Sequence, residues 1–348
     1  MERRFSKYVI IGAGLSGLTS AYYLQKSGET DFLLLESRER LGGRILTNEG
    51  IDLGATWFQT HHERLLDLIG ELDIDKFYQY SKGNSVMVYS TMAPEHYFES
   101  DPNTPPAYRI SGNSKALINA LAKPFSEKIN TETTAMAISE AANGLTVETD
   151  KGMFSAEKVI VTVPPRIALR ISFSPELPVA ITETMTKTHT WMSNAMKVGL
   201  TFKKPFWRGK NMSGMLIGQV GAVTELYDHC DTKGQKYALM GFINEGLRDF
   251  SPEARQERIL NYIAKYLGRE VMDYQNYFEK DWSQDPNTSC EAIKSIYMSP
   301  SYGNPVFEKA YLKNKLLFSG AETSPVSGGY MDGAVYSGIK AAEKAMQL

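Results

Sequence analysis

The sequence predicts an α/β fold in which a Rossmann-type domain is joined by a second, α+β domain. Three observations support this fold class. A strand pattern, a Gly-rich turn and a helical pattern follow one another at the N-terminus, and a second Gly-rich helix start lies near the C-terminus. Alternating strand patterns fill much of the chain between them. The length of 348 residues suggests two domains.

The N-terminal unit has the order strand, turn, helix, strand within about 30 residues, the size of a βαβ unit. Tyr8 to Ile11 are an apolar, β-branched run typical of a strand buried on both faces. A helical pattern covers residues 15–26. A second apolar run, Leu33 to Leu35, ends at Glu36.

Periodicity and turn residues predict the later elements. They are helices over 60–72, 114–123, 252–268 and 333–346, β-hairpins over 129–163 with a turn at Asn143-Gly144, strands over 196–203, 236–243 and 315–318, and a Pro-rich loop or domain crossing over 90–108.

Composition excludes several classes of function. The net charge of −2, from 38 basic and 40 acidic residues, predicts no basic surface for binding nucleic acid or an anionic membrane. No run of 18 or more apolar residues predicts a membrane span, and the terminal patterns lead us to expect neither a signal peptide nor a C-terminal anchor. Two distant cysteines and five scattered histidines predict neither a disulfide framework nor a metal site. We therefore expect a cytoplasmic protein without nucleic-acid or membrane partners. Its oligomeric state is not predicted.

Residues 12–17, GAGLSG, form a GxGxxG turn that follows a strand and opens a helix. Gly12 allows the tight turn, Gly14 allows close approach of a pyrophosphate, and Gly17 allows helix and strand to pack closely. Ser16 lies in the same turn. The helix N-terminus offers free N–H groups to phosphates. Glu36, 19 residues after Gly17, is placed to accept ribose hydroxyls. This context predicts a dinucleotide site.

Three further blocks specify the kind of dinucleotide enzyme. Residues 36–44 read ESRERLGGR, residues 52–57 read DLGATW, and residues 317–323 and 328–338 read LFSGAET and GGYMDGAVYSG. Together these blocks resemble the flavin-containing amine oxidase family, whose members are monoamine oxidase-like in sequence and glutathione reductase-like in fold. The resemblance covers most of the chain. Larger members carry a long substrate-domain insertion after the DLGxxW block, and only a short segment stands here, which leaves pocket depth open.

The resemblance implies FAD as the cofactor. Arg44 would approach the pyrophosphate as a fork of donors, Glu322 would accept a hydroxyl of the cofactor, and the backbone of Ala135 would face the adenine. Non-covalent binding is favoured, because Cys290 lies one position short of the family's flavin-linked cysteine; a covalent link is the alternative. With the turn residues, the expected cofactor-binding set is Gly12, Gly14, Ser16, Gly17, Glu36, Arg38, Gly43, Arg44, Gly54, Ala55, Thr56, Trp57, Ala135, Trp282, Glu322, Gly329, Tyr330 and Met331.

Two residues are candidates for the chemistry. Lys197 precedes a Pro-Phe-Trp block, where the family places a lysine that holds a water against flavin N5. Its ammonium on an apolar strand is costly without partners; the alternative is an edge-strand lysine that reaches solvent. Tyr330 matches one wall of the family's aromatic substrate cage, or is a core tyrosine. No tyrosine directly follows Cys290 to form the second wall, for which Trp191 is a candidate.

The reaction implied is oxidation of an amine C–N bond. Hydride would pass from the amine carbon to flavin N5, the imine would hydrolyse, and dioxygen would reoxidise the flavin to give hydrogen peroxide. The alternatives are another flavin enzyme of this fold, such as a desaturase or a protoporphyrinogen oxidase-like or renalase-like enzyme, and a non-catalytic flavin-binding protein. We expect a discontinuous FAD-binding domain of residues 1–77, 105–186 and 285–348. The substrate domain would comprise residues 78–104 and 187–284.

Overall fold

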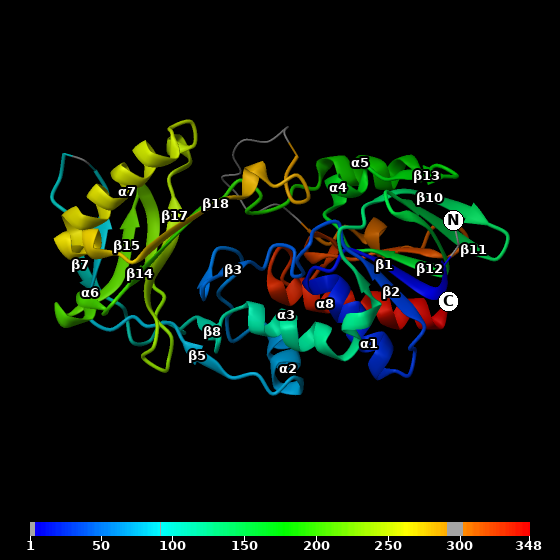
Figure 1. The fold of residues 1–348 in the computed structure, drawn as a ribbon, viewed down its shortest axis with the longest axis horizontal. Helices are drawn as coiled ribbons and strands as arrows, with labels where there is room; N and C mark the ends of the chain where they lie inside the picture. The colour runs from blue at the N-terminus through cyan, green and yellow to red at the C-terminus, as the bar shows by residue number, and fades with distance from the viewer. Residues whose placement is uncertain (1–3, 91, 291–301) are drawn as a thin grey trace.

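The computed structural model describes residues 4–90, 92–290 and 302–348. These residues form two lobes, each built on one large sheet (Figure 1). The lobe that holds both chain ends contains an eight-stranded sheet, and the other lobe contains a seven-stranded sheet. The predicted fold class, a Rossmann-type domain with a second α+β unit, is confirmed.

The first sheet has the order β13-β10-β11-β12-β1-β2-β9, with β19 beside β12. The strands β9, β2, β1, β12 and β19 run parallel. Ile11, Leu35 and Val161 are aligned at the carboxyl ends of three of them. The strands of this sheet are β1 (Arg4–Ile11), β2 (Phe32–Leu35), β9 (Ile129–Asn130), β10 (Ala135–Ala141), β11 (Gly144–Thr149), β12 (Gly152–Val161), β13 (Ser172–Ser174) and β19 (Leu316–Phe318).

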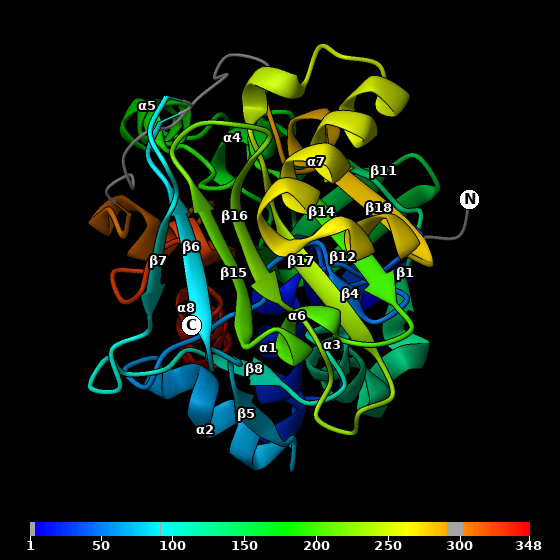
Figure 2. The same cartoon turned by 90° about the vertical axis from the view of Figure 1, so that its left-hand side faces the viewer.

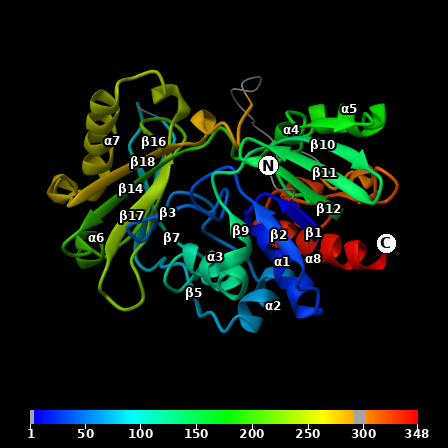
Figure 3. The same ribbon diagram turned by 45° about the vertical axis from the view of Figure 1, so that its right-hand side comes forward.

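Helices cover one face of the parallel strands (Figure 3). Helix α1 (Leu15–Lys26) packs against α8 (Met331–Gln347), and both contribute to one apolar core with Tyr8 and Leu34. The two helices can approach closely because Gly338 has no side chain. A Cβ at this position would lie only 2.5 Å from the Ser16 carbonyl oxygen. The remaining helices of this lobe are α2 (Glu63–Glu71), α3 (Lys115–Ala122), α4 (Pro165–Ala168) and α5 (Val179–Lys187).

The second sheet has the order β18-β14-β17-β16-β15-β6-β7. Helix α7 (Pro252–Leu267) covers the face turned away from the first lobe (Figure 2). Its side chains share a core with Val198 and Leu226. The other elements of this lobe are β6 (Asn84–Val88), β7 (His96–Glu99), β14 (Met196–Phe202), β15 (Met212–Gly218), β16 (Val223–Asp228), β17 (Tyr237–Ile243), β18 (Asn276–Asp281) and α6 (Phe206–Gly209).

Short elements connect the lobes. Strands β3 (Thr47–Asn48) and β4 (Ile51–Asp52) pair with each other, as do β5 (Lys76–Tyr78) and β8 (Tyr108–Ile110). Ile51 and Leu53 pack on Met240 of the second sheet.

The 3₁₀ helices are η1 (Lys123–Lys128), η2 (Glu245–Leu247), η3 (Arg269–Asp273), η4 (Trp282–Gln284), η5 (Pro305–Glu308) and η6 (Ala321–Thr323). Within the described ranges, every helix is too short or too polar to cross a bilayer.

Local patterns predicted many of these elements. The helix over 15–26 is confirmed residue for residue, and the Asn143-Gly144 turn joins β10 and β11 as predicted. Ser251 caps α7, accepting a hydrogen bond from the N–H of Ala254 at 3.3 Å. The loop predicted over 90–108 is wrong in part, because β7 and the first residue of β8 lie within it. Strand β7 is an edge strand whose pairing with β6 comes from tertiary packing, which weak local alternation does not reveal.

Candidate active site

One cavity of about 420 Å³ lies at the carboxyl edge of the parallel strands and extends to the inner face of the second sheet. This edge is where α/β folds bind ligands. Sixteen of the eighteen residues predicted to bind the cofactor line the cavity, as does Lys197. Of the predicted set, Gly17 and Glu322 do not line it. The structure therefore brings the separate sequence blocks together, while the role of each residue stays a prediction.

The two Gly-rich turns lie against each other. Gly42 donates its N–H to the Ala13 carbonyl at 2.9 Å, and the Cα of Gly43 lies 3.9 Å from the Cβ position of Gly14. A Cβ on Gly17 would lie 1.9 Å from the Gly12 carbonyl oxygen, so only glycine allows α1 to start so close to β1.

Arg40, which sequence reasoning missed, holds the second turn. Its guanidinium donates to the carbonyls of Leu41, Gly43 and Ile45 at 2.9–3.3 Å. Three hydrogen bonds from one side chain therefore fix the shape of this turn. The signal that could have identified Arg40 is its position in the ESRERLGGR block, just before the glycine pair.

Glu36 is buried at the end of β2 and connects both turns to the rest of the site. Its Oε2 accepts the N–H of Ala13 at 2.8 Å, and its Oε1 accepts the N–H of Arg38 at 3.0 Å. The carboxylate is thus held in one orientation beside the cavity.

Arg44 and Glu322 form an ion pair that the sequence did not predict. Arg44 Nη1 lies 2.7 Å from Glu322 Oε1, and Nη2 donates to Oε2 at 2.9 Å. The guanidinium, which we expected to face a pyrophosphate, is therefore bound to a fully buried carboxylate. Glu322 Oε1 forms the ion pair with Arg44 Nη1, but no donor is aligned with it for a hydrogen bond.

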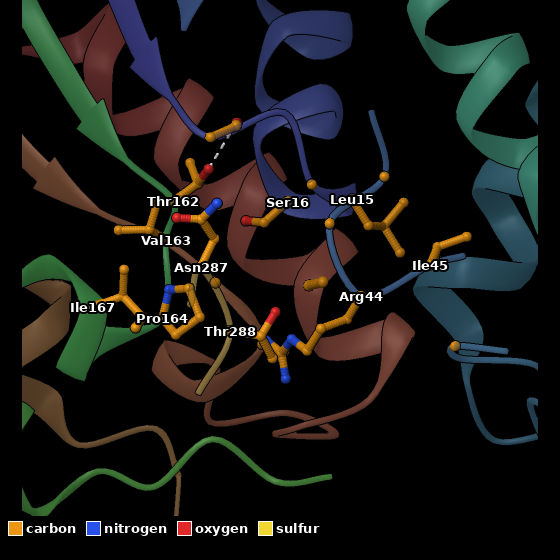
Figure 4. Close-up of a pocket in the computed structure, with 18 of the residues that line it drawn as sticks. Leu15, Ser16, Arg44, Ile45, Thr162, Val163, Pro164, Ile167, Asn287 and Thr288 are labelled. Atoms are coloured by element: carbon orange, nitrogen blue, oxygen red, sulfur yellow. Dashed lines mark hydrogen bonds between the residues drawn. The ribbon is translucent and has the colours of Figure 1, made fainter. Parts of the chain in front are cut away.

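A chain of hydroxyl groups links the starts of α1 and α8. Ser16 Oγ lies 2.6 Å from Ser319 Oγ, which lies 3.0 Å from Ser337 Oγ, which lies 2.8 Å from Thr323 Oγ1. Figure 4 shows the Ser16 side chain facing the cavity, with Arg44, Asn287 and Thr288 around it. The N-terminal and C-terminal sequence blocks are therefore parts of one structure.

Lys197 lies on β14, on the face of the second sheet that meets the first lobe. Its Nζ donates to the Gly54 carbonyl at 2.8 Å and to Thr56 Oγ1 at 3.2 Å. The ammonium also lies 5.4 Å from the ring centre of Trp57 and 5.0 Å from that of Phe242. Only 2% of the residue is exposed, so the edge-strand alternative is wrong.

Burial lowers the pKa of Lys197 to about 7. The negative charges of Asp52 and Glu225 act in the opposite direction, and the positive charge of Arg109 adds to the lowering. Near neutral pH, Nζ is therefore divided between its charged and neutral forms. Such a group can hold or release a proton at low cost.

A buried polar cluster that the sequence did not indicate lies behind this lysine. Asp52 accepts hydrogen bonds from Thr47 Oγ1 at 2.6 Å and from the N–H of Ser114 at 3.1 Å. His229 Nε2 accepts the N–H of Asp52 at 3.1 Å, and burial holds the pKa of His229 well below its ordinary value. Arg109 donates to the Cys230 carbonyl at 3.2 Å. The cluster fixes the strand from which Gly54 and Thr56 follow.

Tyr330 and Trp191 form an aromatic pair at the cavity. Their ring centres are 4.9 Å apart at 83°, and Tyr330 is 42% exposed. Tyr302 fixes the segment of Trp191, because its hydroxyl accepts the Trp191 N–H and donates to the His189 carbonyl, both at 2.8 Å. Residues 291–301, where the family would supply a second wall after Cys290, lie outside the described residues. Cys290 is a half-buried free thiol and does not line the cavity.

Several lining residues had no signal in the sequence. Phe242 could have been found only from its register opposite Lys197. Asn287 and Thr288 come from the segment after β18, and Figure 4 shows them beside Pro164 and Arg44. Trp282, in contrast, was predicted; its indole donates to the Leu53 carbonyl at 2.8 Å and holds this segment at the junction of the lobes.

The residues present fit FAD. The cavity joins the N-termini of two long helices, α1 and α8, which suits phosphates and other electron-rich groups. The cavity also continues from Glu36 in the first lobe to Lys197 in the second, which suits an extended dinucleotide.

Comparison with known proteins gave consistent matches. The sequence model of the family described as flavin containing amine oxidoreductase matches residues 15–91 and 77–346. A probable flavin-containing monoamine oxidase A of Dictyostelium discoideum is 24% identical over 97% of this chain and 96% of that protein. A putrescine oxidase of Kocuria rosea is 23% identical over 80% of this chain and 82% of that protein.

Solved structures match over the whole length. A putrescine oxidase bound to putrescine superposes with a TM-score of 0.85, at 20% identity over 100% of both chains. A cyclohexylamine oxidase from Brevibacterium oxydans superposes with a TM-score of 0.83, at 19% identity over 98% of this chain and 99% of that chain. The alignment with the Dictyostelium protein spans 447 positions, about 100 more than this chain has residues, so that relative carries segments that this chain lacks.

Proposed function

Because the chain belongs to the family of flavin-containing amine oxidoreductases, we propose that its cavity binds FAD and a small amine, with Lys197 and Tyr330 acting in the oxidation of the amine C–N bond. The protein is an FAD-dependent amine oxidase. The observation that carries the proposal for the site is a buried lysine, with a lowered pKa, that lines the cavity.

When bound, FAD would supply the oxidising group, an acceptor for hydride from the carbon beside the amine nitrogen. The cofactor would be held by the Gly-rich turns, by Glu36 and by the start of α8. We propose non-covalent binding, since Cys290 does not line the cavity.

Lys197 acts through Nζ. The Gly54 carbonyl and Thr56 Oγ1 take two of its hydrogen-bonding directions, which leaves one for a water or a substrate in the cavity. Because its pKa is about 7, Nζ can take up or release a proton during turnover without a large free-energy cost.

The aromatic side chains orient the amine and exclude water. Tyr330 and Trp191 present ring surfaces at one part of the cavity, and Trp57 and Phe242 enclose Lys197. Aromatic faces attract an alkylammonium group through their quadrupoles. Apolar walls around it strengthen the remaining polar contacts.

We also infer dioxygen as the second substrate, hydrogen peroxide as the product and the cytoplasm as the location. The chain divides, in this proposal, into an FAD-binding domain of residues 1–77, 105–186 and 285–348 and a substrate domain of residues 78–104 and 187–284. The support is that the first set contributes the eight-stranded sheet and nearly all of the predicted cofactor residues.

The test is anaerobic mixing of the oxidised, FAD-loaded protein with primary, secondary and diamine substrates while the visible flavin band is followed. We expect at least one amine to bleach the band, and admission of air to restore it with formation of peroxide. A protein that stays yellow with every amine would overturn the proposed substrate class. Bleaching that air does not reverse would overturn dioxygen as the acceptor.

A further inference from the structure

The segment that follows β18 crosses from the second lobe onto the first. Residues 282–290 continue directly from β18 and lie beside the end of β2 and the segment after α4. Arg170, in the first lobe, donates to the Pro286 carbonyl at 2.5 Å. Asn287 and Thr288 of the segment line the cavity. We refer to residues 282–290 as the crossing segment.

Arg38 holds the crossing segment from the other side. Its Nη2 donates to Asp285 Oδ1 at 2.6 Å and to Thr288 Oγ1 at 3.0 Å. The ion pair is largely buried, with 14% of the Arg38 side chain and 8% of the Asp285 side chain exposed. Asp285 Oδ1 also accepts the N–H of Asn287 at 3.1 Å, so the same oxygen fixes the backbone that carries the two lining residues.

Asp285 remains ionised in this environment. Burial alone would raise its pKa, but the positive charges of Arg38 and Lys280 more than offset that effect, and the pKa lies below its ordinary value. Lys280 Nζ donates to the second carboxylate oxygen at 3.4 Å. A neutral amide could replace the shape of this side chain but not its charge.

The pair continues to the predicted ribose acceptor. The N–H of Arg38 donates to Glu36 Oε1, and Arg38 Nη1 lies 3.5 Å from the same oxygen. Glu36 in turn holds the Gly-rich turn through Ala13. Arg38 therefore joins the residue that would bind the ribose to the segment that enters the first lobe from β18.

We propose that Arg38, Asp285 and Thr288 form a clasp that closes the crossing segment over the adenosine half of bound FAD and slows release of the cofactor. The inference rests on the proposed FAD site. Asp285 does not touch the cofactor; it is a positioning residue that acts through Arg38 and through Asn287 and Thr288.

The test is the rate at which FAD leaves the purified holoenzyme after dilution, followed by the rise of FAD fluorescence. Asp285→Asn should release FAD roughly 10- to 100-fold faster, as expected from loss of a charged hydrogen bond. The double variant Arg38→Met/Asp285→Asn should release FAD no faster than Arg38→Met alone, because the Arg38–Asp285 interaction is already lost in the single variant.

The matched control is Glu279→Gln on β18. Glu279 pairs with Arg255 at 2.7 Å and is similarly buried, with 16% of the Glu279 side chain and 13% of the Arg255 side chain exposed, but neither residue lines the cavity. This variant should keep the wild-type rate of release. Equal acceleration by Glu279→Gln, or unchanged release from Asp285→Asn, would overturn the clasp. A wild-type protein purified without FAD and unable to bind it would instead overturn the proposed function.

Discussion

Substitution of Lys197 by methionine should stabilise the protein at neutral pH while damaging catalysis. Displacement of a lysine pKa from 10.5 to about 7 corresponds to a free-energy cost of roughly 5 kcal/mol for the charged form in the folded state. Methionine removes that cost and has a similar length. It also leaves the Gly54 carbonyl and Thr56 Oγ1 without their donor, which offsets roughly 1–3 kcal/mol of this stabilisation.

The pH dependence gives the sharper test. Between pH 7 and pH 10.5 the unfolded chain binds a proton at this lysine that the folded chain does not, so wild-type stability rises with pH across that window. The methionine variant lacks this dependence. Its stability relative to wild type should therefore fall by about 3 kcal/mol between pH 7 and about pH 9.5.

The assay is urea unfolding followed by tryptophan emission, at a fixed saturating concentration of FAD, at both pH values. Lys203→Met, at an exposed lysine near the end of the same strand, is the control and should show no such change. A difference between Lys197→Met and wild type that is the same at both pH values would refute the argument, because it would mean that Lys197 keeps its charge on folding.

The remaining predictions concern turnover and the Gly-rich turn. The rate of anaerobic flavin bleaching by an amine should change across a transition near pH 7 in wild type, and Lys197→Met should lack that transition. Tyr330→Leu should raise KM for a primary amine roughly tenfold, through loss of aromatic attraction, whereas Tyr78→Leu on the exposed surface should not change it. Gly17→Ala should lower both the melting temperature and the FAD bound per chain, because its Cβ would lie 1.9 Å from the Gly12 carbonyl oxygen. Gly70→Ala in α2, which has open space around it, should be neutral or stabilising.

The sequence by itself determined the features that depend on local backbone chemistry. The GxGxxG turn, the helix over 15–26 and the acid at the end of β2 are encoded by glycine conformation, apolar periodicity and short spacing. The presence of a second Gly-rich helix start was equally visible. These features were enough to predict the fold class and a dinucleotide site.

Tertiary structure alone decided which charged groups meet. Arg44 is bound to Glu322, 278 positions away, and Arg38 is bound to Asp285, 247 positions away. The sequence shows each residue but not its partner, because the energy of an ion pair depends on distance and burial after the sheets have packed. Lys197 makes the same point. Its position was visible in the sequence, but its lowered pKa arises only when the second sheet closes against the first lobe and removes the ammonium from water.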